Sequence, residues 1–477
     1  MADTISWSAT KDDELEDGPL LGADTSGDAP TAQGKRTYSS VGQVLRQLLP
    51  SLVGNFSIGY NYSIIEWALN WNSARISAEL RGMVLSGALF GCMAGMLVFG
   101  YAGDRLGRHR AMFLTLCMIV LGAVGCGSAF GDAPMRQLVL WRFVLGTGLG
   151  GMYPLSAVSA AESEQQQQGS AQGGWLQGKE MRVGTVFCCG AFGSVAAPLL
   201  VSLVSVLGLE PGAAWRVVLI LGGLPTLCIL PGAAAKAFPA PDEEKTASRQ
   251  PAKDDDELSH WEVLRRLIGT AGSWFLFDVV VFGVMTAMPD ISRQILGHGS
   301  TASMALSTAA ISSVTVPASI LSLVLCRDSA FGRKRLQQIG FLVNSMGLFL
   351  LAFVYHNRDH HEGGDALLTM AYVCMIFMIN FGTPMTTFML PAETFPPSIR
   401  STCNGVSAAV GKMGAIVGAA AFAPFDRDEG LTLTLGLCTV FSIMGALLTT
   451  LFTVGGRKNA VGGVAADGGS PTHGALS

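Results

Sequence analysis

Charge is scarce in this chain. Only 14% of its 477 residues are Asp, Glu, Lys or Arg, while 49% are hydrophobic. A soluble domain carries roughly a quarter charged residues. The composition therefore excludes an ordinary soluble protein and predicts a multi-pass integral membrane protein embedded in the lipid bilayer.

Motifs of enzymes and nucleotide-binding proteins are also missing. The chain contains no HExxH, GxSxG or Walker pattern, and its seven histidines fall nearly all in tails and loops. We therefore expect no catalytic residue, no metal and no cofactor. The net charge of −4, with basic residues spread over several loops, argues against nucleic acid as a partner. The ten cysteines lie nearly all in apolar runs and are interpreted as packing residues.

Long apolar runs take up most of the chain. Each has roughly the 20 residues that an α-helix needs to cross a hydrocarbon core, and their uninterrupted length excludes the alternating strands of a β-barrel. The fold class predicted is an all-α membrane protein with twelve transmembrane helices in two six-helix halves. The predicted spans are 44–67, 82–102, 111–130, 138–160, 183–206, 215–237, 267–288, 302–326, 336–355, 367–390, 402–422 and 431–454.

Polar segments divide the chain into parts. Residues 1–43 are acidic and polar, without the basic start of a cleaved signal, and are predicted to be a disordered tail. A charged, proline-containing linker at 239–264 separates the halves 44–238 and 265–455, and residues 456–477 form a second tail.

Two loops in equivalent places of the two halves are similar. GYAGDRLGRHR at 100–110 follows the second span, and DSAFGRKR at 328–335 follows the eighth. Such repeats are typical of secondary transporters, which bind solute between their halves near mid-membrane. Because short basic loops stay in the cytoplasm, both tails and the linker are predicted to be cytoplasmic.

Several stretches resemble a known family. Asp104, Arg105, Gly107 and Arg108, together with Arg142 and the glycines after it, resemble the signature loops of the major facilitator superfamily. GGMYPLSAVSAAE at 150–162 is similar to a segment of its phosphate:proton symporters, as are the stretches at 274–283, 380–402 and 403–419. The resemblance implies a monomeric transporter of the plasma membrane that moves inorganic phosphate together with protons.

Ionisable residues inside spans are candidates for function because charge is costly in hydrocarbon. Asp278 lies within the seventh span, one turn after Trp274, and Lys412 lies within the eleventh. The resemblance implies that Tyr153, Trp274 and Asp278 bind phosphate and that Lys412 balances the carboxylates. The alternative is an ion pair that only ties two helices together. The resemblance also implies a cytoplasmic gating loop formed by Asp104, Arg105, Gly107, Arg108 and Arg142.

The same comparison shows departures at the expected binding site. Met152 stands where the family has Asp, and Ile58 and Asn61 occupy the first-span motif that there contains Asp. Three further positions expected to be polar or to form a Gly-Pro-Asn turn carry Gly190, Phe282 and Met385.

These replacements leave few proton carriers. A desolvated carboxylate can load and release a proton during transport, and Met, Ile and Asn cannot. Asp278 is then the main candidate for proton coupling. Glu66, two turns after Ile58, is a second candidate, or it is simply solvated at the helix end.

Three functions fit the sequence. The first is a phosphate transporter working by alternating access, with altered proton coupling. The second is a transporter of an organophosphate or another small solute on the same fold. The third is a non-transporting phosphate sensor, which the short tails without a folded module disfavour.

Overall fold

The computed structural model describes residues 32–73, 76–131, 133–163, 178–239, 258–296, 299–327, 331–358, 364–422 and 428–454. Within these ranges the regular elements are helices. Most of the predicted first tail (1–31), most of the linker (240–257), the second tail (455–477) and the start of the second basic loop (328–330) lie outside the described residues.

The first half contains six helical segments long enough to cross a membrane, and four of them, over 78–106, 108–127, 179–206 and 211–237, are also apolar enough to be candidate membrane spans. Gly222 and Gly223 separate α6 from α7, and the two together form one apolar crossing over Pro211–Ala237. The helices are α1 (Ala32–Trp71), α2 (Ala78–Leu106), α3 (Arg108–Gly127), α4 (Pro134–Glu162), α5 (Lys179–Val206), α6 (Pro211–Leu221) and α7 (Leu224–Ala237).

The second half also contains six crossings, because two of them are again built from paired shorter helices. The predicted all-α, twelve-helix fold is confirmed. Its helices are α9 (His260–Leu296), α10 (Thr301–Ser313), α11 (Thr315–Arg327), α12 (Gly332–His356), α13 (Gly364–Ile379), α14 (Thr383–Thr394), α15 (Arg400–Phe422) and α16 (Asp428–Phe452).

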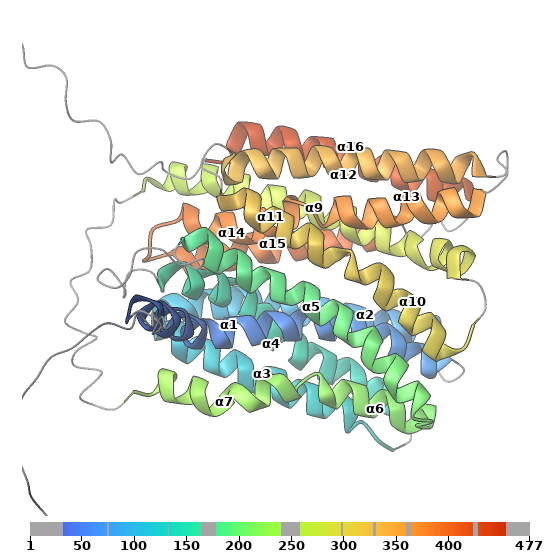
Figure 1. Cartoon of the computed structure of the whole chain (residues 1–477), viewed down its shortest axis with the longest axis horizontal. Coiled ribbons are helices and arrows are strands. Elements are labelled where there is room, and N and C mark those ends of the chain that lie inside the picture. Colours follow the sequence, from blue (N-terminus) through green and yellow to red (C-terminus); the bar gives the residue numbers. More distant parts are fainter. Residues whose placement is uncertain are drawn as a thin grey trace, which may run out of the picture.

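The two halves lie side by side with their helices running in the same general direction (Figure 1). We call the end of the bundle where α7 ends and α9 begins the linker face. Arg110 at the α2–α3 junction donates to the carbonyl of Ala237 (3.2 Å), and Arg266 donates to that of Thr394 (2.7 Å). The ends of α2, α7 and α14 therefore share this face with the start of α9.

Two helix starts differ from the sequence prediction. α1 begins at Ala32 inside the predicted tail, and α9 begins at His260 inside the predicted linker. The added turns are polar and extend an existing helix, which is easier than nucleating a new one. Pro50 lies within α1, and the first, darkest blue turns of this helix run at an angle to the rest (Figure 1).

The predicted tenth span is broken rather than continuous. α13 ends at Ile379 and α14 starts at Thr383, with Gly382 between them at a φ of 70°. The amide of Gly382 donates to the Ser322 hydroxyl of α11 (2.8 Å). An interruption at membrane depth is tolerated when its polar backbone groups find partners inside the protein, which is the case here.

Glycine brings α2 and α4 close together within the first half. A Cβ atom on Gly150 would lie 2.1 Å from the carbonyl oxygen of Cys92, whereas one on Gly82, also in α2, would have nothing within 4 Å. Small residues at such contacts let helix backbones approach each other.

We therefore predict opposite effects for two glycine substitutions. Gly150→Ala forces the helices apart and lowers the free energy of unfolding by about 1–3 kcal/mol. Gly82→Ala, which gains helix propensity on an open surface, is neutral or stabilising by up to ~1 kcal/mol. Thermal unfolding of the purified variants in one detergent checks this, and equal melting temperatures would contradict the proposed contact.

Candidate functional site

A buried ion pair lies at mid-depth in the second half. Lys412 of α15 donates from Nζ to Oδ2 of Asp278 of α9 at 2.8 Å, and both side chains are buried, with 7% and 5% of their surface exposed. Lys412 follows Arg400, where α15 starts on the linker face, by about twelve residues, or roughly 18 Å of helix. The pair is therefore far from water on the linker side.

The structure brings the four predicted binding residues together. The rings of Tyr153 and Trp274 meet edge to face with centroids 6.1 Å apart, and Lys412 Nζ lies 5.6 Å from the Tyr153 centroid. Trp274 is seated against Gly411, where a Cβ atom would lie 2.5 Å from the indole. Tyr153 comes from α4 in the first half and the other three from the second half, so the cluster spans the junction.

Two further aromatic rings surround the ammonium group. The Phe282 centroid is 5.3 Å and the Tyr62 centroid 5.9 Å from Lys412 Nζ, and such ring faces attract a cation. The Tyr62 hydroxyl in turn donates to Cys92 Sγ at 3.0 Å. Sequence reasoning missed Tyr62, although its place in the first-span motif beside Asn61 was a usable signal.

This cluster is chemically suited to a small oxyanion. Lys412 supplies a positive charge. Its present partner is the Asp278 carboxylate, which accepts hydrogen bonds through its oxygen atoms as a small oxyanion does. The Tyr153 hydroxyl and the Trp274 indole N–H are donors that could serve further oxygen atoms. An anion competing with Asp278 for Lys412 would leave the carboxylate to be neutralised by a proton.

The positions that lack the expected polar residues are packed. Met152 is fully buried, its sulfur accepts from the Thr115 hydroxyl (3.1 Å), and its methyl group fills the space beside Gly54. A Cβ atom on Gly59 would lie 1.9 Å from the Gly190 carbonyl oxygen, which shows that α1 and α5 approach closely there. Ile58 and Met385 are also buried.

Glu66 lies apart from the cluster. Its carboxylate pairs with Arg81 of α2, and its side chain is 49% exposed. The geometry matches the solvated helix-end alternative rather than a place beside Lys412.

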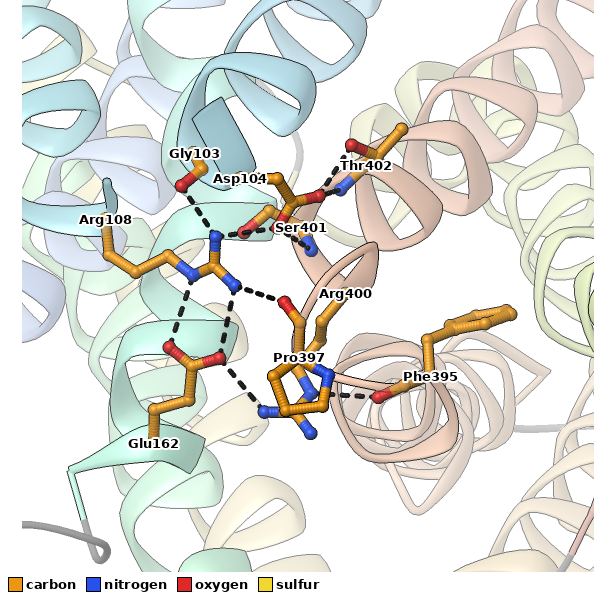
Figure 2. Close-up of polar contacts among 9 residues, drawn as sticks. All are labelled: Gly103, Asp104, Arg108, Glu162, Phe395, Pro397, Arg400, Ser401 and Thr402. Carbon is orange, nitrogen blue, oxygen red and sulfur yellow. Dashed lines mark hydrogen bonds and ion pairs between the residues drawn. The ribbon is translucent and has the colours of Figure 1, made fainter. Parts of the chain in front are cut away.

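Asp104 holds the two halves together on the linker face. Its Oδ2 accepts from the amide (2.7 Å) and hydroxyl (2.6 Å) of Thr402, and its Oδ1 accepts from the amide of Ser401 (3.2 Å). A carboxylate of α2 in the first half thus caps the first turn of α15 in the second (Figure 2). Side-chain capping of free amides stabilises a helix start.

Arg108 and Arg400 complete this contact. Arg108 forms a two-pronged contact with Glu162 (3.2 Å for both bonds), binds Asp104 (2.6 Å) and donates to the carbonyl of Pro397 (2.8 Å). Arg400 approaches the same Glu162 at 3.0 Å (Figure 2). We call Asp104, Arg108, Glu162, Arg400 and Thr402 the latch. Sequence reasoning missed the last three, although Glu162 and Arg400 are charged residues within the stretches that resemble the family.

The second half repeats part of this arrangement. Gly332 precedes Arg333 with a φ of 66°, as Gly107 precedes Arg108 with a φ of 91°. Arg333 pairs with Glu393 at the end of α14 (2.7 Å), in the manner of Arg108 and Glu162. The sequence similarity of the two loops is therefore matched in structure at the glycine–arginine step where α3 and α12 begin.

Two residues of the predicted gating loop make no latch contact in the structure. Arg105 is exposed and lies over the Tyr101 ring (5.4 Å). Arg142 precedes Glu162 in α4 by about twenty residues, or roughly 30 Å of helix, and it is buried with Nη1 donating to the carbonyl of Asn61 (3.2 Å). The prediction that groups Arg142 with this loop is wrong, because α4 carries it to the opposite part of the bundle.

Two repeated six-helix halves with a buried charged cluster between them define a secondary transporter. The chain belongs to the Major Facilitator Superfamily, whose sequence profile matches residues 51–419. Membership of this transporter family confirms the expectation that the protein is not an enzyme.

Relatives in other organisms carry phosphate transporter names. The chain is 31% identical over 424 residues to inorganic phosphate transporter PT2 of Toxoplasma gondii, covering 85% of this chain and 72% of that protein. It is 32% identical over 405 residues to the probable inorganic phosphate transporter 1-7 of Arabidopsis thaliana, covering 75% of each.

Solved structures show the same fold. The proton:xylose symporter XylE bound to 6-bromo-6-deoxy-D-glucose superposes with a TM-score of 0.67 at 17% identity, covering 87% of this chain and 97% of that one. The partially occluded, inward-open form of XylE from E. coli has a TM-score of 0.63 at 15% identity, covering 87% and 99%.

Removing one member of the buried pair should be worse than removing both. Lys412→Met or Asp278→Asn alone leaves the charge of the other residue buried without its counterion. For a buried pair this lowers the free energy of unfolding by about 3–5 kcal/mol. We predict that the double variant is more stable than Lys412→Met, which leaves the Asp278 carboxylate unpaired. Unfolding of the four proteins gives the coupling free energy, and strictly additive losses would show that the pair does not interact.

Weakening the latch should open the linker face. We predict that Asp104→Asn, which removes a charge from the contacts to Arg108 and Thr402, lengthens the distance between spin labels at the exposed positions Leu106 and Ser398. Arg105→Gln is the matched control on the same loop. Double electron–electron resonance spectroscopy measures the distances in proteins whose native cysteines have been replaced. An unchanged distance distribution in Asp104→Asn would reject the role of the latch.

Proposed function

We propose that this protein transports inorganic phosphate across a membrane by alternating access. The observation that carries the proposal is the cluster of Lys412, Asp278, Trp274 and Tyr153, which combines one cation, one carboxylate and two donors at mid-depth between the halves. The phosphate transporter names of relatives at about 30% identity support this solute.

Proton coupling in this proposal depends on Asp278. When phosphate approaches Lys412, it competes with Asp278 for the ammonium group, and protonation of the displaced carboxylate keeps the charge of the cluster low. Among the described residues, Lys412 forms its ion pair with Asp278, and the side chains of Met152 and Ile58 have no proton to exchange. We therefore propose coupling through a single carboxylate in the cluster.

The latch supplies the gate in this mechanism. With Asp104, Arg108 and Glu162 engaged across the halves, the linker face is closed, and solute exchange on that side requires these contacts to break. We place the linker face, the linker and both tails in the cytoplasm, because the basic loops gather there. Monomeric function at the plasma membrane is part of the same proposal.

Uptake by proteoliposomes tests the proposal. We expect radiolabelled phosphate uptake to be stimulated by an inward proton gradient, and Asp278→Asn to lose most of this stimulation. Glu66→Gln, on a carboxylate outside the cluster, should retain it. Phosphate uptake by both variants is compared with uptake by the wild-type protein reconstituted at the same protein-to-lipid ratio.

Each other outcome has a defined meaning. Phosphate uptake that does not depend on the proton gradient would support phosphate as the solute and reject proton coupling. No phosphate uptake, with uptake of an organophosphate, would reject the solute. Binding of phosphate without any uptake would favour a sensor.

A further inference from the structure

Among the residues that the structure describes, Arg142 is a buried cation without a carboxylate partner. Its side chain is 1% exposed, and Nε has no hydrogen-bond partner. Nη1 donates to the backbone carbonyl of Asn61 at 3.2 Å. Among the ion pairs of the described residues, none includes Arg142.

An arginine in this position stays charged, because the guanidinium does not lose its proton in proteins. An unpaired charge removed from water is strongly unfavourable, and the cost is larger in a membrane-embedded bundle. A counterion is therefore required, and a neutral partner such as a backbone carbonyl supplies only part of the compensation.

The side chains around Arg142 do not provide that negative charge. Within the described part of the chain, the titratable groups close enough to interact with it electrostatically are Cys126, Tyr62, Cys92 and Glu66. The first three are ordinarily neutral, and Glu66 is half exposed and engaged by Arg81.

Asn61 cannot serve either. Its amide nitrogen donates to the carbonyls of Ser57 (2.9 Å) and Gly222 (3.3 Å), so the side chain is turned toward its own helix and the α6–α7 junction. Arg142 nevertheless donates to the backbone carbonyl of Asn61, so position 61 is where a carboxylate introduced on α1 would be nearest to the guanidinium in the chain.

Charge counting gives the same result for the middle of the bundle. Among the described residues, the charged side chains that are more than nine-tenths buried and lie away from the linker face are Arg142, Asp278 and Lys412. Asp278 and Lys412 cancel each other. One positive charge on Arg142 is left over.

We propose that a small inorganic anion, of which chloride is the physiological example, binds beside Arg142 and neutralises it in place of a carboxylate. A monovalent halide fits better than phosphate, because the neighbours are thiols and a tyrosine whose hydroxyl is already engaged by Cys92. Four phosphate oxygens would need more donors than this surrounding offers.

The site is separate from the Lys412 cluster. Arg142 precedes Tyr153 in α4 by about eleven residues, or roughly 16 Å of helix, whereas Lys412 lies against the Tyr153 ring. The hydrogen-bonded pair of Tyr62 and Cys92 interacts with both cations and links the two sites.

Thermal unfolding of the full chain in detergent tests the proposal without depending on transport. In phosphate-free buffer at constant ionic strength, replacing gluconate by chloride should raise the melting temperature of the wild type by about 2 °C or more, because a ligand that binds only the folded state stabilises it. Arg142→Gln should remove the response. Asn61→Asp should remove it too, with a melting temperature near that of the chloride-saturated wild type.

Other results would overturn the proposal. These are a wild type indifferent to chloride, an Arg142→Gln protein that responds as the wild type does, or an Asn61→Asp protein that keeps the full response. If Arg142→Gln does not fold, equilibrium dialysis with radiolabelled chloride compares the wild type with Asn61→Asp, and equal binding by the two rejects the site.

The same unfolding experiment with phosphate in place of chloride distinguishes this site from the proposed transport site. Phosphate stabilisation that survives in Arg142→Gln and is lost in Lys412→Met assigns phosphate to the Lys412 cluster and leaves chloride to Arg142. Phosphate that reproduces the chloride response and fails in Arg142→Gln would replace chloride as the anion and overturn the halide assignment. Failure of phosphate transport alone changes neither reading.

Discussion

The contact between Lys412 and Asp278 is the interaction on which the central site depends. Either charge alone would be strongly unfavourable at mid-membrane, and each makes the other tolerable. The pair fixes α9 against α15, places Trp274 beside Tyr153 of the other half, and leaves a cation that an anion can reach only by competing with a carboxylate. In the proposed mechanism a structural ion pair and a binding site are the same pair of residues, so the two interpretations raised by the sequence do not exclude each other.

The latch applies a similar principle at the linker face. Asp104 caps a helix of the opposite half, and Glu162 is shared by Arg108 and Arg400. Arg108 and Glu162 keep 16% and 23% of their side-chain surface exposed, compared with 7% and 5% for Lys412 and Asp278, so separating this pair into water costs less than separating the central pair. A set of contacts that is specific but less costly to break suits a gate, whereas in the proposed mechanism the central pair separates only when an anion takes the place of the carboxylate beside Lys412.

The positions that lack family-typical polar residues show how the chain has adjusted. Met152 is packed between Gly54 and Thr115 instead of leaving a void. Asn61 is turned toward Gly222, and Arg142 retains its charge beside it. Loss of a carboxylate is structurally harmless where a neutral side chain fills the space, but it leaves an electrostatic deficit wherever a buried cation remains. Arg142 is such a cation.

The sequence by itself determined the twelve crossings, the two-half organisation and four members of the central cluster, because apolar length and the cost of buried charge are local properties readable residue by residue. It could not reveal that Tyr62 and Phe282 face Lys412, that α13 and α14 are separate helices, or that Glu162 and Arg400 meet across the halves. It also misplaced Arg142. Only the tertiary structure decided these points, since each depends on how far along a helix a residue lies and which distant helix packs beside it.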